Sequence, residues 1–153
     1  MVWKPHVTVA AIAERDGRFL LVEERTSEGR VYNQPAGHLE EGESLLDAVC
    51  RETLEETAWR FVPEAVCGIY LWRHEATAQT FLRVSFCGHV DHHQPDQPLD
   101  DGILATHWLT PAELRQHRQW LRSPLVLRSL EDYLAGARYP LGVLSHIESG
   151  QAP

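Results

Sequence analysis

The chain has 153 residues and a formal net charge of −8, with 43% apolar and 24% charged residues. This composition is typical of a folded globular domain and unlike that of a disordered chain. The acidic balance argues against a nucleic-acid polymer as partner, because phosphate contacts need a basic surface. The sequence has no run of ~20 apolar residues and no signal-peptide pattern, so we expect no membrane partner and a cytoplasmic location.

Predicted strands dominate the front of the chain. The dipeptide Asp16-Gly17 is typical of a two-residue hairpin turn, which would join two antiparallel strands. Pro35 ends the third strand, because proline lacks the N–H that a sheet needs. In chain order, β-branched and alternating residues predict strands at 6–12, 18–22, 31–34, 65–74, 80–90 and 106–109.

Three helices are predicted from their start signals. Ser44 followed by Asp47 is a capping-box pattern, so a helix should begin there and extend to about residue 59. Thr110-Pro111 and Ser123-Pro124 each combine an N-cap with proline at the first helical position, and the second of these helices should reach about residue 135. We expect one domain over residues 1–144 and a flexible C-terminal tail over 145–153.

The first predicted helix carries the residues most suited to chemistry. Glu52, Glu55 and Glu56 fall on the side opposite its apolar residues, and Arg51 can pair with Glu55 one turn away. Carboxylates this close repel one another unless a cation lies among them, and magnesium binds through a few carboxylates plus substrate phosphates. The backbone carbonyl of Gly37 could approach the same ion. The alternative is an ordinary solvated acidic face, which the fixed spacing of these residues makes a weaker interpretation.

The segment 37–59 resembles the Nudix box. That pattern is a glycine, five residues, a glutamate, seven residues, Arg-Glu, an aliphatic, any residue, Glu-Glu, any residue, a glycine and an aliphatic. The matching residues are Gly37, Glu43, Arg51, Glu52, Glu55 and Glu56. Thr53 stands where an aliphatic residue is usual, and Ala58 replaces the final glycine. A left-handed helix end costs a non-glycine residue about 1 kcal/mol, so we expect a slightly altered exit from the helix.

The resemblance implies a fold of the α+β class, an α/β/α sandwich with a mixed central sheet, and a magnesium-dependent hydrolase of diphosphate linkages. The implied metal ligands are Glu52, Glu55, Glu56 and Gly37, with manganese as an alternative ion. The implied catalytic residues are Glu52, Glu55 and Arg51. Family members also take a base from a later loop, and here Asp100 and Asp101 stand just before the last predicted strand.

Further likeness to bacterial Nudix phosphatases, over residues 4–10, 33–40, 122–126 and 138–141, implies a substrate class. It comprises nucleoside di- and triphosphates and the pyrimidine diphosphate intermediate of thiamin synthesis. Candidate substrate contacts are Asn33, whose amide can read a ring edge, Arg83, which can meet phosphate, and Trp72, which can stack on a ring. Alternatives are a hydrolase of ADP-ribose or dinucleoside polyphosphates, a non-catalytic nucleotide sensor, and a purely structural domain. We expect a monomer or small homo-oligomer.

Overall fold

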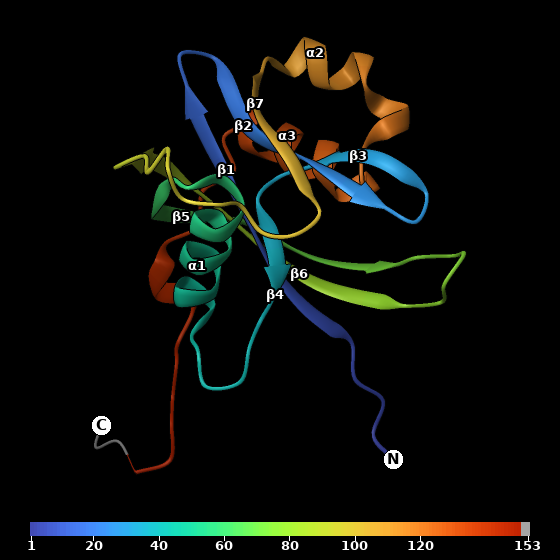
Figure 1. The fold of residues 1–153 in the computed structure, drawn as a ribbon. Helices are drawn as coiled ribbons and strands as arrows, with labels where there is room; N and C mark the ends of the chain where they lie inside the picture. Colours follow the sequence, from blue (N-terminus) through green and yellow to red (C-terminus); the bar gives the residue numbers. More distant parts are fainter. Residues whose placement is uncertain (151–153) are drawn as a thin grey trace.

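The computed structural model describes residues 1–150, in which seven strands form one mixed sheet of order β3-β2-β1-β6-β5 (Figure 1). β4 pairs with β1 and β7 with β2; β1 and β6 are parallel, and the other pairs are antiparallel. The strands are β1 (His6–Arg15), β2 (Arg18–Thr26), β3 (Gly29–Asn33), β4 (Ala36–His38), β5 (Arg60–Arg73), β6 (Thr80–Asp91) and β7 (Ile103–Leu109). The helices are α1 (Leu45–Thr57), α2 (Pro111–Gln116) and α3 (Pro124–Leu134), with 3-10 turns η1 (Arg118–Trp120) and η2 (Leu141–Val143).

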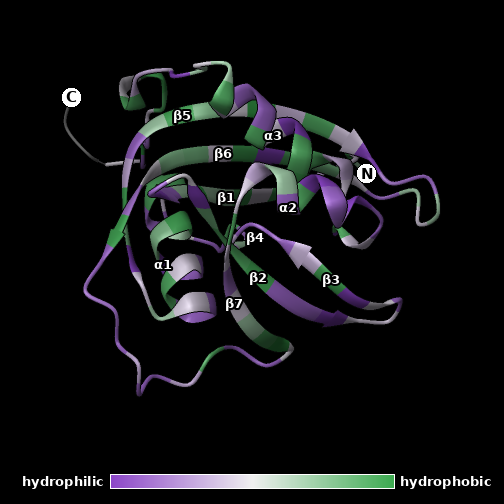
Figure 2. Ribbon diagram, turned by 90° about the horizontal axis from the view of Figure 1, so that it is seen from above, coloured by the Kyte–Doolittle hydropathy of each residue, from purple (hydrophilic) through white to green (hydrophobic). Residues whose placement is uncertain are grey.

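The central strand β1 divides the core into two layers, because successive side chains of a strand point to opposite faces. Val9 and Ala11 pack with Val49 of α1 on one face. Ile12 packs with Val126 of α3 on the other, in a cluster that also includes a leucine of α2. Figure 2 shows α1 lying apart from α2 and α3 across the strands. Helices therefore cover both faces of a mixed sheet, and the predicted α/β/α sandwich is confirmed.

The local start and turn signals act as predicted. Asp16 and Gly17 both have positive φ, 51° and 77°, which is the backbone of a type I′ hairpin. The Ser44 hydroxyl accepts a hydrogen bond from the Asp47 N–H at 3.1 Å and begins α1. Thr110 forms a complete capping box with Glu113 at the start of α2. These contacts join residues at most three positions apart, so sequence alone reveals them.

The exit from α1 differs from the expectation. Ala58 has φ 61° and ψ 16°, and its N–H donates to the carbonyl of Leu54. It therefore adopts the left-handed conformation that a glycine would adopt, and the helix ends without the expected alteration. Thr53, the other departure from the box, is fully buried and donates its hydroxyl proton to the Val49 carbonyl at 2.8 Å. A threonine thus fills the aliphatic position with its polar atom satisfied inside the helix.

The structure extends β1 to Arg15 and β2 to Thr26, shifts β3 to 29–33 and starts β7 at Ile103, and two further strands differ more. β5 begins at Arg60, five residues earlier than predicted. The prediction missed this start because register shifts near Pro63 and Val66 interrupt the alternation of side chains. β4 lies outside the predicted strands, because its three residues are too few to show alternation, and its strand hydrogen bonds come from pairing with β1. Residues 145–150 contain no helix or strand, while 151–153 lie outside the described residues. The domain limits and the flexible tail stay predictions.

Candidate active site

The close approach of β4 to α1 brings together the first two residues of the site, Gly37 and Glu52. Gly37 of β4 pairs with Val9 of β1, and the side chain of Val9 points to the face of the sheet where α1 packs. A Cβ on Gly37 would overlap the carboxylate of Glu52. Only a residue without a side chain allows this strand and this glutamate to lie so near each other.

Three carboxylates gather beside this contact. Glu52, Glu55 and Asp100 each offer one oxygen, and these atoms all lie within 4.8 Å of one another. The backbone N–H of Asp100 donates to the Glu55 carbonyl at 3.0 Å, which fastens the loop before β7 to α1. Asp101 is exposed and lies outside the group. The structure thus separates two aspartates that the sequence could not tell apart.

Arg51 ties this group to the loop before α1. Its guanidinium forms a two-pronged pair with Glu43, at 3.0 and 2.7 Å. Nη1 also contacts Glu52 at 2.8 Å and Glu55 at 3.2 Å. These hydrogen bonds lower the pKa of Glu43 and raise that of Arg51. The predicted pair with Glu55 is one of several, so Arg51 orients two carboxylates of the group at once.

Glu56 lies on the side of α1 opposite to its predicted position. It is only 6% exposed, on the same side of α1 as the buried Val49 and Thr53, which precede it by seven and three positions. Its Oε1 accepts a hydrogen bond from the Ala36 N–H of β4 at 2.7 Å. Burial raises the pKa of this carboxyl to about 9. Its prediction on the side opposite the apolar residues was wrong, because the seven positions from Val49 to Glu56 amount to about 700°, which is nearly two full turns and returns Glu56 to the side of Val49. The backbone donor that satisfies the carboxyl comes from a strand 20 residues away.

The donor set fits a hard divalent cation. All three grouped side chains supply carboxylate oxygens, the ligands that Mg²⁺ and Mn²⁺ favour. Burial raises the pKa of Glu52, and the neighbouring carboxylates raise it further, against the opposing effect of Arg51. A bound cation would favour the charged form of these groups.

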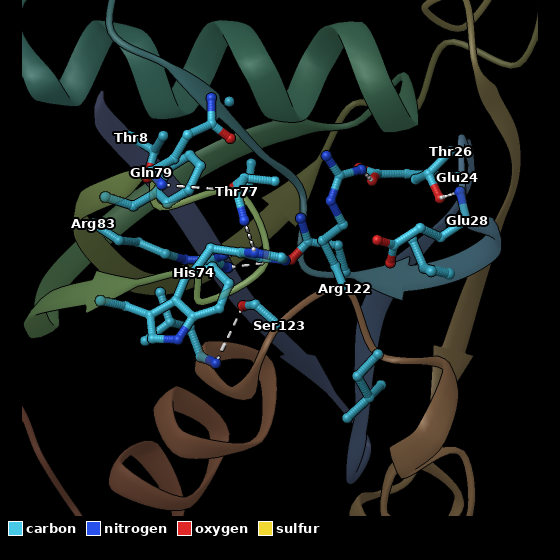
Figure 3. Close-up of a pocket in the computed structure, with 18 of the residues that line it drawn as sticks. Thr8, Glu24, Thr26, Glu28, His74, Thr77, Gln79, Arg83, Arg122 and Ser123 are labelled. Atoms are coloured by element: carbon cyan, nitrogen blue, oxygen red, sulfur yellow. Dashed lines mark hydrogen bonds and ion pairs between the residues drawn. The ribbon is translucent and has the colours of Figure 1, made fainter. Parts of the chain in front are cut away.

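A pocket of about 510 Å³ lies next to the group, with Gly37 in its lining (Figure 3). All three predicted substrate residues line it: Asn33, Trp72 and Arg83. Trp72 is half-buried and stacks on Phe81, with ring centroids 5.7 Å apart. Arg83 is 5% exposed and contacts the Asn33 amide oxygen at 3.4 Å. The structure therefore gathers these residues in one cavity beside the carboxylates.

Sequence reasoning missed one wall of this pocket. Glu24 of β2 and Arg122, just before α3, form an ion pair at 2.9 Å across one wall. His38 lines the pocket next to Gly37, and its ring contacts that of His6 at 3.2 Å between nitrogens. Glu24 and Arg122 stand 98 residues apart, so no spacing along the chain could have predicted their contact.

The chain resembles known proteins over most of its length. The NUDIX domain family matches residues 3–130. Phosphatase NudJ from Escherichia coli strain K12 is 40% identical over 144 residues, covering 94% of this chain and 92% of that protein. A NUDIX hydrolase from Nitrosomonas europaea has a TM-score of 0.93 and 46% identity, over 96% of this chain and 100% of that one.

A more distant structure shares only the fold. It is a bifunctional NMN adenylyltransferase/ADP ribose pyrophosphatase from Francisella tularensis, solved with AMP and a manganese ion. The match has a TM-score of 0.68 and 16% identity, over 86% of this chain and 41% of that one.

Proposed function

Because this chain belongs to the Nudix hydrolase family, an enzyme family acting on pyrophosphate bonds, we propose that it hydrolyses nucleoside di- and triphosphates with bound magnesium and releases phosphate. The pyrimidine diphosphate intermediate of thiamin synthesis is a second proposed substrate. The similarity of the chain to a bacterial phosphatase, over 94% of its length, supports these proposed substrates.

One observation carries the proposal. The group Glu52, Glu55 and Asp100 borders, through Gly37, a pocket large enough for a nucleotide's organic part. A cation site beside a cavity is the arrangement that a phosphorylated small molecule requires, because the ion meets the phosphates while the cavity holds the remainder.

Glu52, Glu55 and Asp100 would hold the ion, with the Gly37 carbonyl and Glu56 as the further proposed ligands. When bound, magnesium neutralises charge on the phosphates and lowers the pKa of water. Manganese is an alternative ion, and the Francisella neighbour was solved with one.

The chain's own groups divide the remaining work. Glu52 or Glu55 would accept the proton of the attacking water, and Asp100 is the proposed alternative base; Asp101 lies farther away. Arg51 would act as a positioning residue, since it holds Glu52 and Glu55 while Glu43 holds it.

None of the helices within residues 1–150 is long and apolar enough to cross a membrane. The cytoplasmic location and the monomeric or small oligomeric state stay predictions.

Product analysis tests the proposal. The purified protein with magnesium would be given nucleoside di- and triphosphates, the thiamin pyrimidine diphosphate, ADP-ribose and a dinucleoside polyphosphate. We expect orthophosphate to be released from the nucleoside di- and triphosphates and from the thiamin pyrimidine diphosphate. The Glu52→Gln variant should lose this activity. The matched control is Glu41→Gln, an exposed glutamate outside the carboxylate group.

Selective cleavage of ADP-ribose or the dinucleotide would overturn the substrate assignment and leave the hydrolase. Absence of turnover on every compound, with magnesium bound in a fixed ratio, would overturn catalysis and indicate a nucleotide sensor.

A further inference from the structure

Two rows of side chains cross the sheet at the pocket. Residues paired directly between neighbouring strands point to the same face. The register therefore aligns Thr8 and Arg83, which line the pocket, in a polar row across β1 and β6. Tyr70 of β5 continues this row outside the pocket lining, and its hydroxyl donates to Asp132. The next row holds His6, Phe81 and Trp72. Its rings stack in sequence, with centroids 5.2 and 5.7 Å apart, so a strip of aromatic surface borders a strip of hydrogen-bonding groups.

The segment before α3 adds another wall to the same cavity. Trp120, Leu121 and Leu125 line the pocket together with Trp72 and Phe81. The pocket therefore offers apolar and aromatic surface from two separate parts of the chain. Such a cavity suits a flat ring, which can cover apolar area on its faces while its edge meets polar groups.

Arg83 carries a buried charge that forms no ion pair within the described residues 1–150. Its Nη2 donates to the Gln34 amide oxygen at 2.8 Å, and both terminal nitrogens contact the Asn33 amide oxygen at 3.4 Å. Within residues 1–150 no carboxylate lies within ion-pair distance of it, and its buried Nε lacks a hydrogen-bond partner. Burying a cation whose hydrogen-bond partners are all neutral is costly, and the more distant carboxylates of Glu24 and Glu56 offset only part of that cost. A ligand that supplies acceptors would offset that cost.

The neighbours of Arg83 hold it in place. The Gln34 side-chain amide donates to the Val126 carbonyl of α3 at 2.8 Å, which turns its oxygen toward Arg83. Gln34 and Asn33 are both buried. The guanidinium is thus held in one orientation before any ligand arrives, which reduces the entropy lost on binding.

The position of Arg83 favours contact with a ring over contact with phosphates. The carboxylate group lies beside Gly37 on β4, and the strands between run in the order β4-β1-β6. Gly37 pairs with Val9 and Arg83 pairs with Thr8, and these consecutive residues point to opposite faces of the sheet, so the Arg83 side chain lies on the face away from α1. Phosphates held at the carboxylate group would leave the organic end of the substrate to reach this other face.

We propose that Arg83 determines substrate specificity by donating hydrogen bonds to the acceptor edge of a heterocyclic ring that packs against Trp72 and Phe81. This inference rests on the proposed function and names the part of the substrate that Arg83 reads. The ring must present a nitrogen or oxygen acceptor, as cytosine does with O2 or N3, because Asn33 and Gln34 leave one Nη1 N–H and the Nε–H of the guanidinium unused. The sequence had suggested a phosphate contact for this residue instead.

Paired substrates with and without a ring test the proposal. Hydrolysis of CTP and of inorganic tripolyphosphate would be measured for the wild type, Arg83→Gln and Arg83→Lys. We expect KM for CTP to rise about 10-fold to 100-fold in Arg83→Gln, with tripolyphosphate hydrolysis unchanged. Arg83→Lys keeps the charge but loses the planar fork, so it should recover little of the loss. The matched control is Arg73→Gln, an exposed arginine on β5 outside the pocket lining.

Equal losses on both substrates would overturn the inference in favour of a phosphate contact. Unchanged CTP kinetics would overturn it as well. No hydrolysis of either compound by the wild type would instead count against the proposed function.

A binding measurement covers that last case and a variant that fails to fold. In the wild type, the NMR signal of the Arg83 Nε–H should shift when CMP is added and stay in place when tripolyphosphate is added. The reverse pattern, or no shift with either ligand, would contradict the inference independently of turnover.

Discussion

Gly37 and Glu52 lie so close together that a Cβ on the glycine would overlap the glutamate carboxylate. The φ of Gly37 is not in the left-handed region, so close approach alone requires a glycine here. The first residue of the family box is thereby explained by contact with a residue 15 positions later.

Replacing Gly37 by alanine should displace Glu52 and spoil the carboxylate group. We expect kcat/KM to fall about 100-fold, as for other small misplacements of catalytic groups. Steady-state kinetics with magnesium would measure it. Gly142→Ala is the control, because a Cβ there meets nothing within 4 Å. Full activity of Gly37→Ala would show that Glu52 need not hold this position.

Asp100 and Asp101 should behave differently when each is changed to asparagine. Asp100 belongs to the carboxylate group, whereas Asp101 does not. Asp100→Asn should lower kcat/KM by roughly 10-fold to 100-fold and weaken manganese binding, as seen by calorimetry. Asp101→Asn should stay within about twofold of the wild type. Similar effects of both changes would remove Asp100 from the site.

Glu56→Gln should stabilise the metal-free protein in alkaline solution. Burial raises the pKa of this carboxyl to about 9 in the folded state, against an ordinary value of 4.5. Between these values the folded state keeps a proton that the unfolded state has lost, so stability falls as pH rises. Glutamine stays neutral throughout. With EDTA, the variant's Tm should exceed the wild-type Tm at about pH 8 and match it near pH 4.

A variant no more stable than the wild type at the alkaline pH would show that Glu56 is charged in the folded protein. The same variant should lose activity with magnesium, because glutamine cannot supply a charged ligand oxygen.

Ala58→Gly should stabilise the protein by about 1 kcal/mol, because glycine adopts a left-handed helix end without the Cβ penalty. The change should appear as a higher Tm and a higher urea midpoint. Ala135→Gly is the opposite case, since Ala135 ends α3 with φ −77°. There, glycine only adds flexibility to the unfolded chain, and the midpoint should fall. A shift of the same sign in both variants would contradict this account of Ala58.

The alternation that predicts strands explains both the successes and the failures. β1 was visible because it is central and long, with its apolar residues serving two core layers. β4 could not be predicted because three residues are too few to show alternation and because its hydrogen bonds depend on β1. The start of β5 was not predicted because register shifts interrupt the alternation of side chains between the two faces.

The helix of the family box shows the same division. Its start at Ser44 depends on a hydrogen bond within three residues, and its glutamates were identified by spacing. The burial of Glu56 depends on Ala36, and the choice of Asp100 over Asp101 depends on how one loop meets α1. Helical periodicity gives the angle between side chains, but it does not say which side the rest of the protein covers.

The sequence by itself therefore determined the helix starts, the first hairpin, the family and the residues of the box, because these depend on neighbours along the chain. The tertiary structure alone decided which carboxylates converge, that β4 supplies the hydrogen bond to the Glu56 carboxyl, and that Arg83 lies inside a pocket without an ion-pair partner. The reason is physical. Desolvation and hydrogen bonding of a charged group depend on atoms brought near it by folding, and for Glu56 and Arg83 those atoms come from strands and loops 20 to 50 residues away.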